Sequence, residues 1–379
     1  MPGLLPNVDP DGLLEYSVVF TDRSLNHMSQ RFQGVMRDLS AILKEAYQAR
    51  AAIVVPGGGT FGMEAVARQF AGGQRSLVIR NGWFSYRWTQ ILEAGGFGGP
   101  HTVLKARPVR AGRQAPFAPA PLDQVLATIR AERPAVVFAP HVETAAGMML
   151  PNDYLAAVAA AVHEVDGLFV LDCIASGAMW VDMAALGIDV LVSAPQKGWS
   201  GSPCAAFVML GERAQARLEH TRSSSFAADL KKWGQIMAAY EAGGHAYHAT
   251  LPTDALAVCR DVMAQTRSLG WARLREAQLA LGAQARALLE SRGFVSVAAP
   301  GFQAPGVVVS YTDDDGLHTS RSFAPLGLQT AAGVPLQCDE PADYKSFRIG
   351  LFGLDKLLAP EQAVARLAAA MDEGGFRGD

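Results

Sequence analysis

Short runs of apolar residues alternate with segments of mixed polarity along roughly the first half of the chain. The apolar runs are rich in Val, Ile and Leu, which is typical of strands in a parallel sheet covered on both faces. The segments between them carry apolar residues at helical spacing. We expect strands over 51–57, 75–82, 135–141, 168–176 and 189–196, and helices over 61–70, 88–96 and 152–165. This alternation predicts an α/β fold with a doubly wound, mostly parallel sheet that binds ligands at the carboxyl ends of its strands.

The pattern changes beyond about residue 255. Segments rich in Ala, Leu and Arg predict long helices over 255–292, and the apolar stretches "GVVVSY" and "SFRIGLFG" predict strands before a final helix at 359–373. This mixture is typical of a smaller α+β domain. We therefore expect an N-terminal arm (1–22), a large domain (23–260) and a small C-terminal domain (261–379).

Composition limits the classes of partner. The chain has 379 residues, of which 50% are hydrophobic, and its formal net charge is −3, so no basic excess suggests nucleic acid as a partner. No apolar run is long enough to span a membrane, and we recognise no secretion signal at the N-terminus. The four cysteines lack the spacing of a metal site or a disulfide framework, so we expect no metal and a cytoplasmic location with reduced thiols.

A glycine-rich segment, "PGGGTFGMEA" (56–65), joins the first expected strand to the helix that follows it. The N–H groups at the start of a helix are unpaired and carry partial positive charge, so this segment can cradle a phosphate. It matches neither the nucleoside-triphosphate loop nor the dinucleotide fingerprint. A plain strand-to-helix turn explains the segment about equally well.

Two charged residues follow other apolar strands. Asp172 ends "LFVLD", and Lys197 comes directly after "LVSAPQ". Taken alone, Asp172 is more simply a carboxylate that caps a helix or forms a salt bridge, and Lys197 is more simply a surface lysine. A phosphate cradle, a carboxylate and a lysine at one sheet edge, however, are what pyridoxal 5′-phosphate requires. The phosphate needs donors, the ring nitrogen needs an acid, and the aldehyde needs an amine that forms a Schiff base.

With these residues in place, the chain resembles the class V aminotransferases of fold type I, the group of alanine–glyoxylate and serine–glyoxylate aminotransferases. The resemblance covers roughly residues 24–370 and rests on seven segments that occur in the family's order. These are "PGGGTFGMEA", "RNGWFSYRW", "HVETAAGMMLP", "LDCIAS", "SAPQKGWSGSPC", "YHATLP" and "FRIGLFG". The N-terminal segment departs from the family pattern, so the resemblance does not name the substrate.

The resemblance assigns a role to each matched residue. It places Gly58, Gly59 and Thr60 at the cofactor phosphate, Phe84 on the ring, Thr144 at the ring hydroxyl, Asp172 at the ring nitrogen, Gln196 on the cofactor and Lys197 as the Schiff-base lysine. It implies that Tyr247 and Thr250 reach the phosphate of the other subunit of a homodimer, and that Arg348 holds the substrate carboxylate. The implied reaction is ping-pong transfer of an amino group from a small amino acid to a 2-keto acid such as glyoxylate or pyruvate, with Lys197 as the base.

Several alternatives stay open at this stage. A lyase or a cysteine desulfurase on the same fold is one alternative. A desulfurase would need a nucleophilic cysteine on a mobile loop, for which Cys338, ten residues before Arg348, is the candidate. A protein that binds phosphate without covalent chemistry would leave Asp172 and Lys197 unexplained. Arg87 can neutralise a phosphate, bridge subunits or lie on the surface, and Trp199 can pack against the sheet or narrow the pocket.

Overall fold

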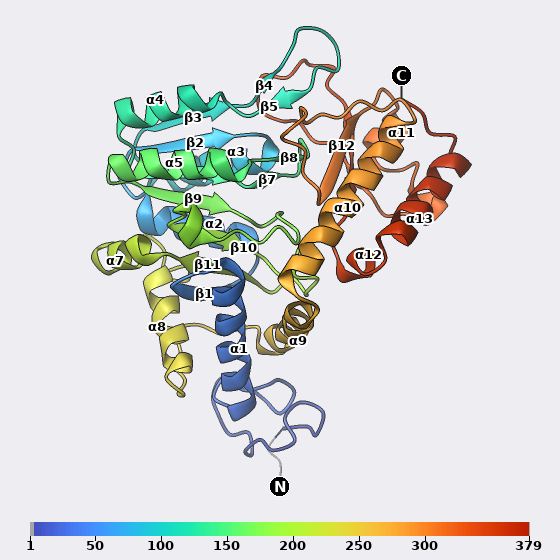
Figure 1. Cartoon of the computed structure of the whole chain (residues 1–379). Coiled ribbons are helices and arrows are strands. Elements are labelled where there is room, and N and C mark those ends of the chain that lie inside the picture. Colours follow the sequence, from blue (N-terminus) through green and yellow to red (C-terminus); the bar gives the residue numbers. More distant parts are fainter. Residues whose placement is uncertain (1–3, 379) are drawn as a thin grey trace.

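A seven-stranded sheet forms the centre of the computed structural model, which describes residues 4–378 (Figure 1). Its spatial order is β1-β11-β10-β9-β6-β2-β3, and only β11 runs against its two neighbours. The strands are β1 (Ala51–Pro56), β2 (Ser76–Arg80), β3 (His101–Lys105), β6 (Val136–Pro140), β9 (Leu168–Asp172), β10 (Val190–Ser193) and β11 (Ala205–Leu210). The predicted mostly parallel sheet is confirmed.

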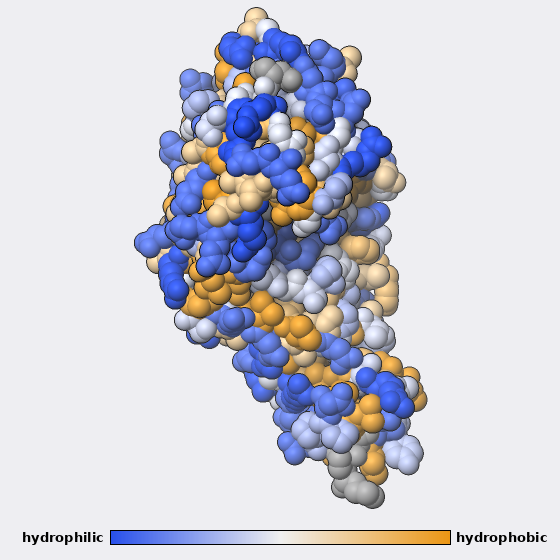
Figure 2. Space-filling model, turned by 90° about the vertical axis from the view of Figure 1, so that its right-hand side faces the viewer, coloured by the Kyte–Doolittle hydropathy of each residue, from blue (hydrophilic) through white to orange (hydrophobic). Residues whose placement is uncertain are grey.

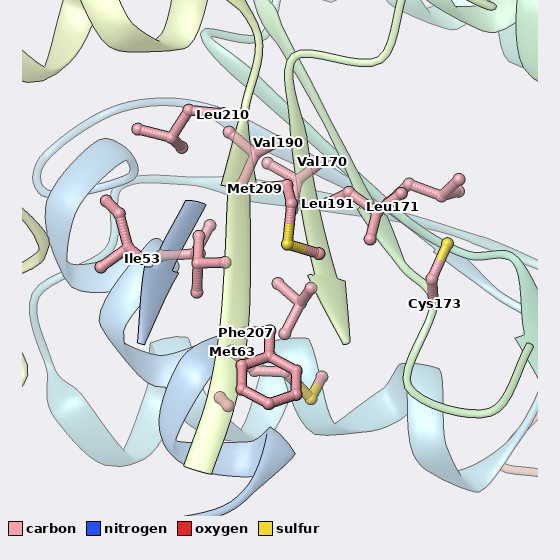
Figure 3. Close-up of a cluster of buried hydrophobic side chains, with 14 of the residues drawn as sticks. Ile53, Met63, Val170, Leu171, Cys173, Val190, Leu191, Phe207, Met209 and Leu210 are labelled. Atoms are coloured by element: carbon pink, nitrogen blue, oxygen red, sulfur yellow. The ribbon is translucent and has the colours of Figure 1, made fainter. Parts of the chain in front are cut away.

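Helices cover both faces of this sheet. Every residue of β2, β6, β9, β10 and β11 is buried, which requires cover on both sides. The helices around the sheet are α1 (Gln30–Tyr47), α2 (Gly59–Phe70), α3 (Trp83–Gly95), α4 (Leu122–Glu132), α5 (Asn152–Glu164), α6 (Met183–Leu186), α7 (Glu212–His220) and α8 (Leu230–Glu241). Helix α2 packs on β10 and β11, where Met63 joins Ile53, Leu191 and Phe207 in the main core (Figure 3).

The C-terminal part has a sheet and a core of its own. Helices α9 (Thr253–Leu269) and α10 (Trp271–Glu290) lead into an antiparallel sheet of order β12-β14-β13, with bounds Val307–Tyr311, Ser346–Gly350 and Ala331–Ala332. Short helices α11 (Asp315–His318) and α12 (Leu354–Leu357) precede the final α13 (Pro360–Glu373). Leu281, Phe347 and Met371 belong to a separate hydrophobic cluster here. The expected boundary at 260 falls within α9, which packs against α1, and the division into domains stays a prediction.

Four short strands occur in the sequence between strands of the main sheet, β4 and β5 before β6 and β7 and β8 after it. They pair as hairpins, β4 (Arg107–Pro108) with β5 (Phe117–Ala118), and β7 (Val142–Glu143) with β8 (Met148–Met149). The second hairpin directly follows β6, so it brings the segment "HVET" to the carboxyl edge of the main sheet. Within residues 4–378, no helix has the length and apolar character that crossing a membrane requires.

The segment before α1 extends away from the sheet as an arm. Residues 4–22 form neither helix nor strand, and Leu13, Tyr16 and Val18 on it are almost fully exposed. The arm lies at the lower end of the molecule in Figure 1, and Figure 2 shows hydrophobic residues among the polar ones at that end. Such exposed apolar side chains are typical of a surface that another chain covers.

Candidate active site

The residues assigned from the sequence gather where the strands of the main sheet end. Strands β1, β2, β6, β9 and β10 all run in one direction, so the loops that follow them meet at one edge of the sheet. In Figure 1 this edge faces the C-terminal elements β12 and α10. The fold thereby brings the glycine-rich segment, Phe84, Asp172 and Lys197 together with Arg348 of β14.

The glycine-rich segment forms a tight connection between β1 and α2. Gly57 has a φ of +116°, which favours glycine, and a Cβ on Gly59 would lie 2.5 Å from Cδ1 of Ile174. Gly58 is the N-cap and offers no side chain to the first turn of α2. The backbone N–H groups of Gly59 and Thr60 therefore remain available to a bound anion, whereas that of Phe61 donates to the Gly58 carbonyl at 2.9 Å. The hydroxyl of Thr60 lies in the same turn and is exposed.

Asp172 ends β9 with a carboxyl group that is almost fully buried. One of its oxygens accepts a hydrogen bond from the backbone N–H of Ile174 at 2.9 Å. Burial raises the pKa of Asp172 to about 7, the negative charge of Glu143 adds to this rise, and the positive charges of Arg87 and Lys197 oppose it. The group is thus poised to hold or share a proton with a partner at the sheet edge.

Lys197 lies in a turn that follows β10 and is packed against the loop after β9. A Cβ on Gly198 would lie 2.7 Å from the carbonyl carbon of Gly177 and closer still to its oxygen, so the two backbones are in direct contact. Burial lowers the pKa of Lys197, and the positive charges of Arg348 and Arg87 lower it further. A lowered pKa favours the neutral amine, which is the nucleophilic form.

The Lys197 loop is also tied to the C-terminal part of the chain. The amine nitrogen of Lys197 lies 5.5 Å from the centre of the Phe352 ring. Ser200, at a φ of +56°, accepts a hydrogen bond on its hydroxyl from the backbone N–H of Leu354 at 2.8 Å. A cavity of about 440 Å³ adjoins Gln196 and Lys197 at this junction.

Phe84 is positioned by Glu143, a residue to which the sequence gave no role. The buried Glu143 carboxylate accepts hydrogen bonds from the backbone N–H groups of Phe84 at 3.2 Å, Ser85 at 2.8 Å and Ala145 at 3.0 Å. The Ser85 hydroxyl donates a further bond to it at 2.7 Å. These bonds cap the start of α3, which begins at Trp83, five residues before the expected helix. The sequence signal that could have revealed this role is the position of Glu143, an acidic residue that directly follows an apolar strand.

Arg348 extends from the middle strand of the second sheet, where it pairs with Val309 and Ala331. Its Nε donates a hydrogen bond to the carbonyl of Ala332 at 2.7 Å, and burial lowers its pKa. The guanidinium carbon lies 5.5 Å from the centre of the Phe84 ring. Arg348 therefore faces the large sheet and the Lys197 loop, as a carboxylate-binding residue of this site would.

Four other assigned residues differ in their surroundings. Thr144 is buried directly after Glu143, and Gln196 is exposed beside Lys197. Tyr247 and Thr250 lie on the loop between α8 and α9, where their hydroxyls are 3.1 Å apart. The exposed Tyr247 ring packs at 5.5 Å from that of His27. Within the chain, Tyr247 and Thr250 therefore contact neither Lys197 nor the residues gathered around it.

Three further residues near the site, Trp199, His141 and Cys338, have defined surroundings in the structure. Trp199 is buried and donates a hydrogen bond from its indole N–H to Ser193 at 3.2 Å, so it packs against the sheet. His141 is buried, bonds to the Ser176 hydroxyl at 2.8 Å, and has a pKa lowered to about 4 by burial, which keeps it neutral. Burial raises the pKa of the Cys338 thiol to about 12, so this residue is a poor nucleophile.

Comparison with known proteins identifies related chains. The family model described as Aminotransferase class-V matches residues 13–315. A 2-aminoethylphosphonate–pyruvate transaminase of Paraburkholderia phymatum is 29% identical over 358 residues, which are 94% of this chain and 91% of that protein. Alanine–glyoxylate aminotransferase 1 of Saccharomyces cerevisiae is 28% identical over 247 residues, 60% of each chain. The crystal structure of an alanine–glyoxylate aminotransferase from Nostoc superposes with a TM-score of 0.73 at 22% identity, covering 92% of this chain and 89% of that one, which shows a common fold.

Proposed function

Because the chain belongs to the aminotransferase class-V family, we propose that it transfers an amino group from a small amino donor to a 2-keto acid such as pyruvate or glyoxylate. It is a pyridoxal-phosphate-dependent enzyme of fold type I. The observation that carries the proposal is the meeting of Lys197, Asp172 and the glycine-rich turn at one edge of the sheet. The names of the relatives supply the range of donors and acceptors to test.

The residues of the site fit pyridoxal 5′-phosphate. The unpaired N–H groups at the start of α2 suit a phosphate. Gly59 lies beside them, and any side chain there would collide with Ile174. Asp172, with its raised pKa, suits a ring nitrogen with which it shares a proton, and Lys197, with its lowered pKa, suits an aldehyde. We propose that Gly58, Gly59, Thr60, Phe84, Thr144, Asp172, Gln196 and Lys197 hold the cofactor in this chain.

The chain's own groups then divide the work of the reaction. Bound pyridoxal phosphate supplies an aldehyde that captures the amino group and a ring that withdraws electrons from it. Lys197 Nζ would move the proton from the donor carbon that bears the amino group to the cofactor carbon that carried the aldehyde, and would move a proton in the opposite direction when the keto acid is the acceptor. Asp172 holds the proton at the ring nitrogen, and Arg348 orients the acidic group of the substrate. The two half-reactions share one site, so ping-pong kinetics are expected.

Desulfuration and other lyase chemistry are not favoured. Cys338 is buried, and its thiol contacts the carbonyl groups of Arg80 and Leu336, so it is neither mobile nor activated. A binding protein without covalent chemistry would have no use for a lysine whose pKa is lowered beside a buried acid.

The direct test follows the cofactor and the amino group together. The purified enzyme should be yellow, and borohydride reduction followed by peptide mapping should place the label on Lys197. Amino donors, including alanine and 2-aminoethylphosphonate, should then form a new amino acid from pyruvate or glyoxylate without releasing ammonia. A colourless protein with unlabelled Lys197, or ammonia without an aminated product, would overturn the proposal. Lys197→Ala is the control variant.

We also propose a homodimer in which Tyr247 and Thr250 complete the phosphate site of the other subunit. The exposed Tyr247, the exposed Phe61 beside Thr60 and the apolar residues of the arm support this assembly. Mixing inactive Lys197→Ala with Tyr247→Ala chains should restore about a quarter of wild-type activity, because half of the reassorted dimers hold one intact site. Failure of the mixture to regain activity, with reassortment verified, would contradict a shared site. The cytoplasmic location expected from the sequence remains a prediction.

A further inference from the structure

Arg87 occupies a position that the proposed assignments do not use. It lies on α3 one turn after Phe84, and its Nη1 donates a hydrogen bond to the Thr60 hydroxyl at 2.9 Å. Its guanidinium carbon is 5.3 Å from the centre of the Phe84 ring. The side chain therefore bridges the residue expected to stack on the cofactor ring and the turn expected to hold the phosphate.

The charge of Arg87 lacks a carboxylate partner in the described part of the chain, since none of the ion pairs formed among residues 4–378 includes it. Arg68 is an instructive contrast. It packs over the Phe97 ring at 4.7 Å and donates to the Ser224 hydroxyl at 3.1 Å, but it also forms an ion pair with Glu64 at 2.7 Å. Arg87 thus has the same kind of surroundings without the counter-charge.

A phosphate monoester at the glycine-rich turn would supply that counter-charge. Such a group carries about −1.5 to −2 at pH 7, whereas the N-terminus of a helix contributes only about half a positive charge. Lys197 is committed to the aldehyde, and Arg348 is fixed to the Ala332 carbonyl on the far strand. Arg87 is the cation that contacts the turn itself, through Thr60.

The electrostatic influence of Arg87 reaches the rest of the site. Its positive charge lowers the pKa values of both Asp172 and Lys197, so the guanidinium lies within range of each group. A position close to all three assigned elements is expected of a group inside the cofactor site.

We propose that Arg87 is a cofactor-binding residue that pairs with the phosphate of pyridoxal 5′-phosphate, with the Thr60 hydroxyl orienting its guanidinium. The inference rests on the proposed function, because it concerns the same cofactor. It predicts that Arg87 discriminates the phosphorylated cofactor from the same ring without phosphate.

The experiment compares binding of pyridoxal 5′-phosphate and of pyridoxal to the apoprotein by absorbance titration. In Arg87→Gln we expect the affinity for pyridoxal phosphate to fall about 10- to 100-fold, because a charge-assisted pair is lost, with pyridoxal binding changed less than about two-fold. Arg87→Lys should fall between wild type and Arg87→Gln, since it keeps the charge but not the fork. Arg68→Gln, the matched control, should bind both compounds like the wild type.

If Arg87→Gln folds poorly, a second measurement on the more conservative Arg87→Lys tests the same inference. Inorganic phosphate should compete with pyridoxal phosphate for wild-type and Arg68→Gln apoprotein, and should compete more weakly in Arg87→Lys, by a smaller factor than the loss expected for Arg87→Gln. An equal loss for both compounds in Arg87→Gln, or no loss for either, would refute the inference and assign Arg87 to packing or to a subunit contact. A wild-type apoprotein that binds neither compound would instead refute the proposed function, and this inference with it.

Discussion

Replacing Gly198 by alanine tests whether the Lys197 loop is fixed by direct backbone contact. The added Cβ would lie 2.7 Å from the carbonyl carbon and 3.0 Å from the Cα of Gly177, and both are backbone atoms that cannot rotate away. Relief requires the two loops to separate by about 1 Å, and overpacking of this kind costs about 1 to 3 kcal/mol of stability. Since a displacement of about 1 Å at a reacting group lowers turnover about 100-fold, activity should fall more than stability does.

Alanine substitutions at two other glycines should give smaller or opposite effects, and they serve as comparisons. At Gly201 an added Cβ would meet Sγ of Cys259 at 3.0 Å and Cβ of Pro195 at 3.2 Å, so the alanine variant should show a smaller loss. At Gly34, inside α1, no atom lies within 4 Å, and alanine should stabilise the protein by about 0.5 to 1 kcal/mol through helix propensity.

Urea unfolding and turnover measured for the three variants would give this order. A Gly198→Ala enzyme whose stability stays within about 0.5 kcal/mol of the wild type, the range of ordinary surface substitutions, would refute the argument from backbone contact.

Three other predictions follow from the buried groups. Trp199→Phe should lose about 1 to 2 kcal/mol of stability, because the indole N–H bond and ring contacts are removed, yet leave KM within about two-fold; a large change in KM would place Trp199 in the substrate pocket. The pKa of Asp172 is raised from 3.8 to about 7 in the folded apoprotein, so its neutral form favours folding at low pH, and that contribution is lost as pH rises through this window. Unfolding free energies of the wild type should therefore fall relative to Asp172→Asn by about 2 to 3 kcal/mol between pH 5 and 7.5, and parallel pH profiles would contradict the assignment. Glu143→Gln should destabilise the protein by about 1 to 3 kcal/mol in thermal unfolding and lower the pKa of Asp172 in a titration, whereas an unchanged melting temperature would show that its hydrogen bonds contribute little.

The sequence predicted five of the seven strands of the main sheet and missed β3 and the antiparallel β11. The expected strand over 168–176 ends at Asp172, and the one over 189–196 ends at Ser193, just before the Lys197 turn. Apolar periodicity specifies burial within one segment, and so the order and kind of these elements can be predicted locally. Helix α3 was expected to begin at residue 88, and it begins at Trp83, where the carboxylate of the distant Glu143 accepts bonds from the N–H groups of Phe84 and Ser85.

For the chemistry of the site, too, some features could be predicted from local segments and others depended on distant ones. The kinds of residue at the strand ends, together with the order of the motifs, were enough to predict the cofactor and the roles of Lys197 and Asp172. The contact between Arg87 and Thr60 and the burial of Trp199 had no sequence signal that separated them from the alternatives. The spacing of the cysteines gave no relation between Cys204 and Cys259, yet their thiols are neighbours in the fold.

The sequence by itself therefore determined the class of fold and the cofactor, and it predicted Lys197 as the reacting lysine, because hydrophobic periodicity and residue chemistry are local properties of the chain. Only the tertiary structure decided which side chains meet across the sheet edge, and so which of them set the pKa of Asp172 and the position of Phe84. The physical reason is that these interactions join segments far apart in the sequence, and their distances depend on how helices and strands pack rather than on any one segment.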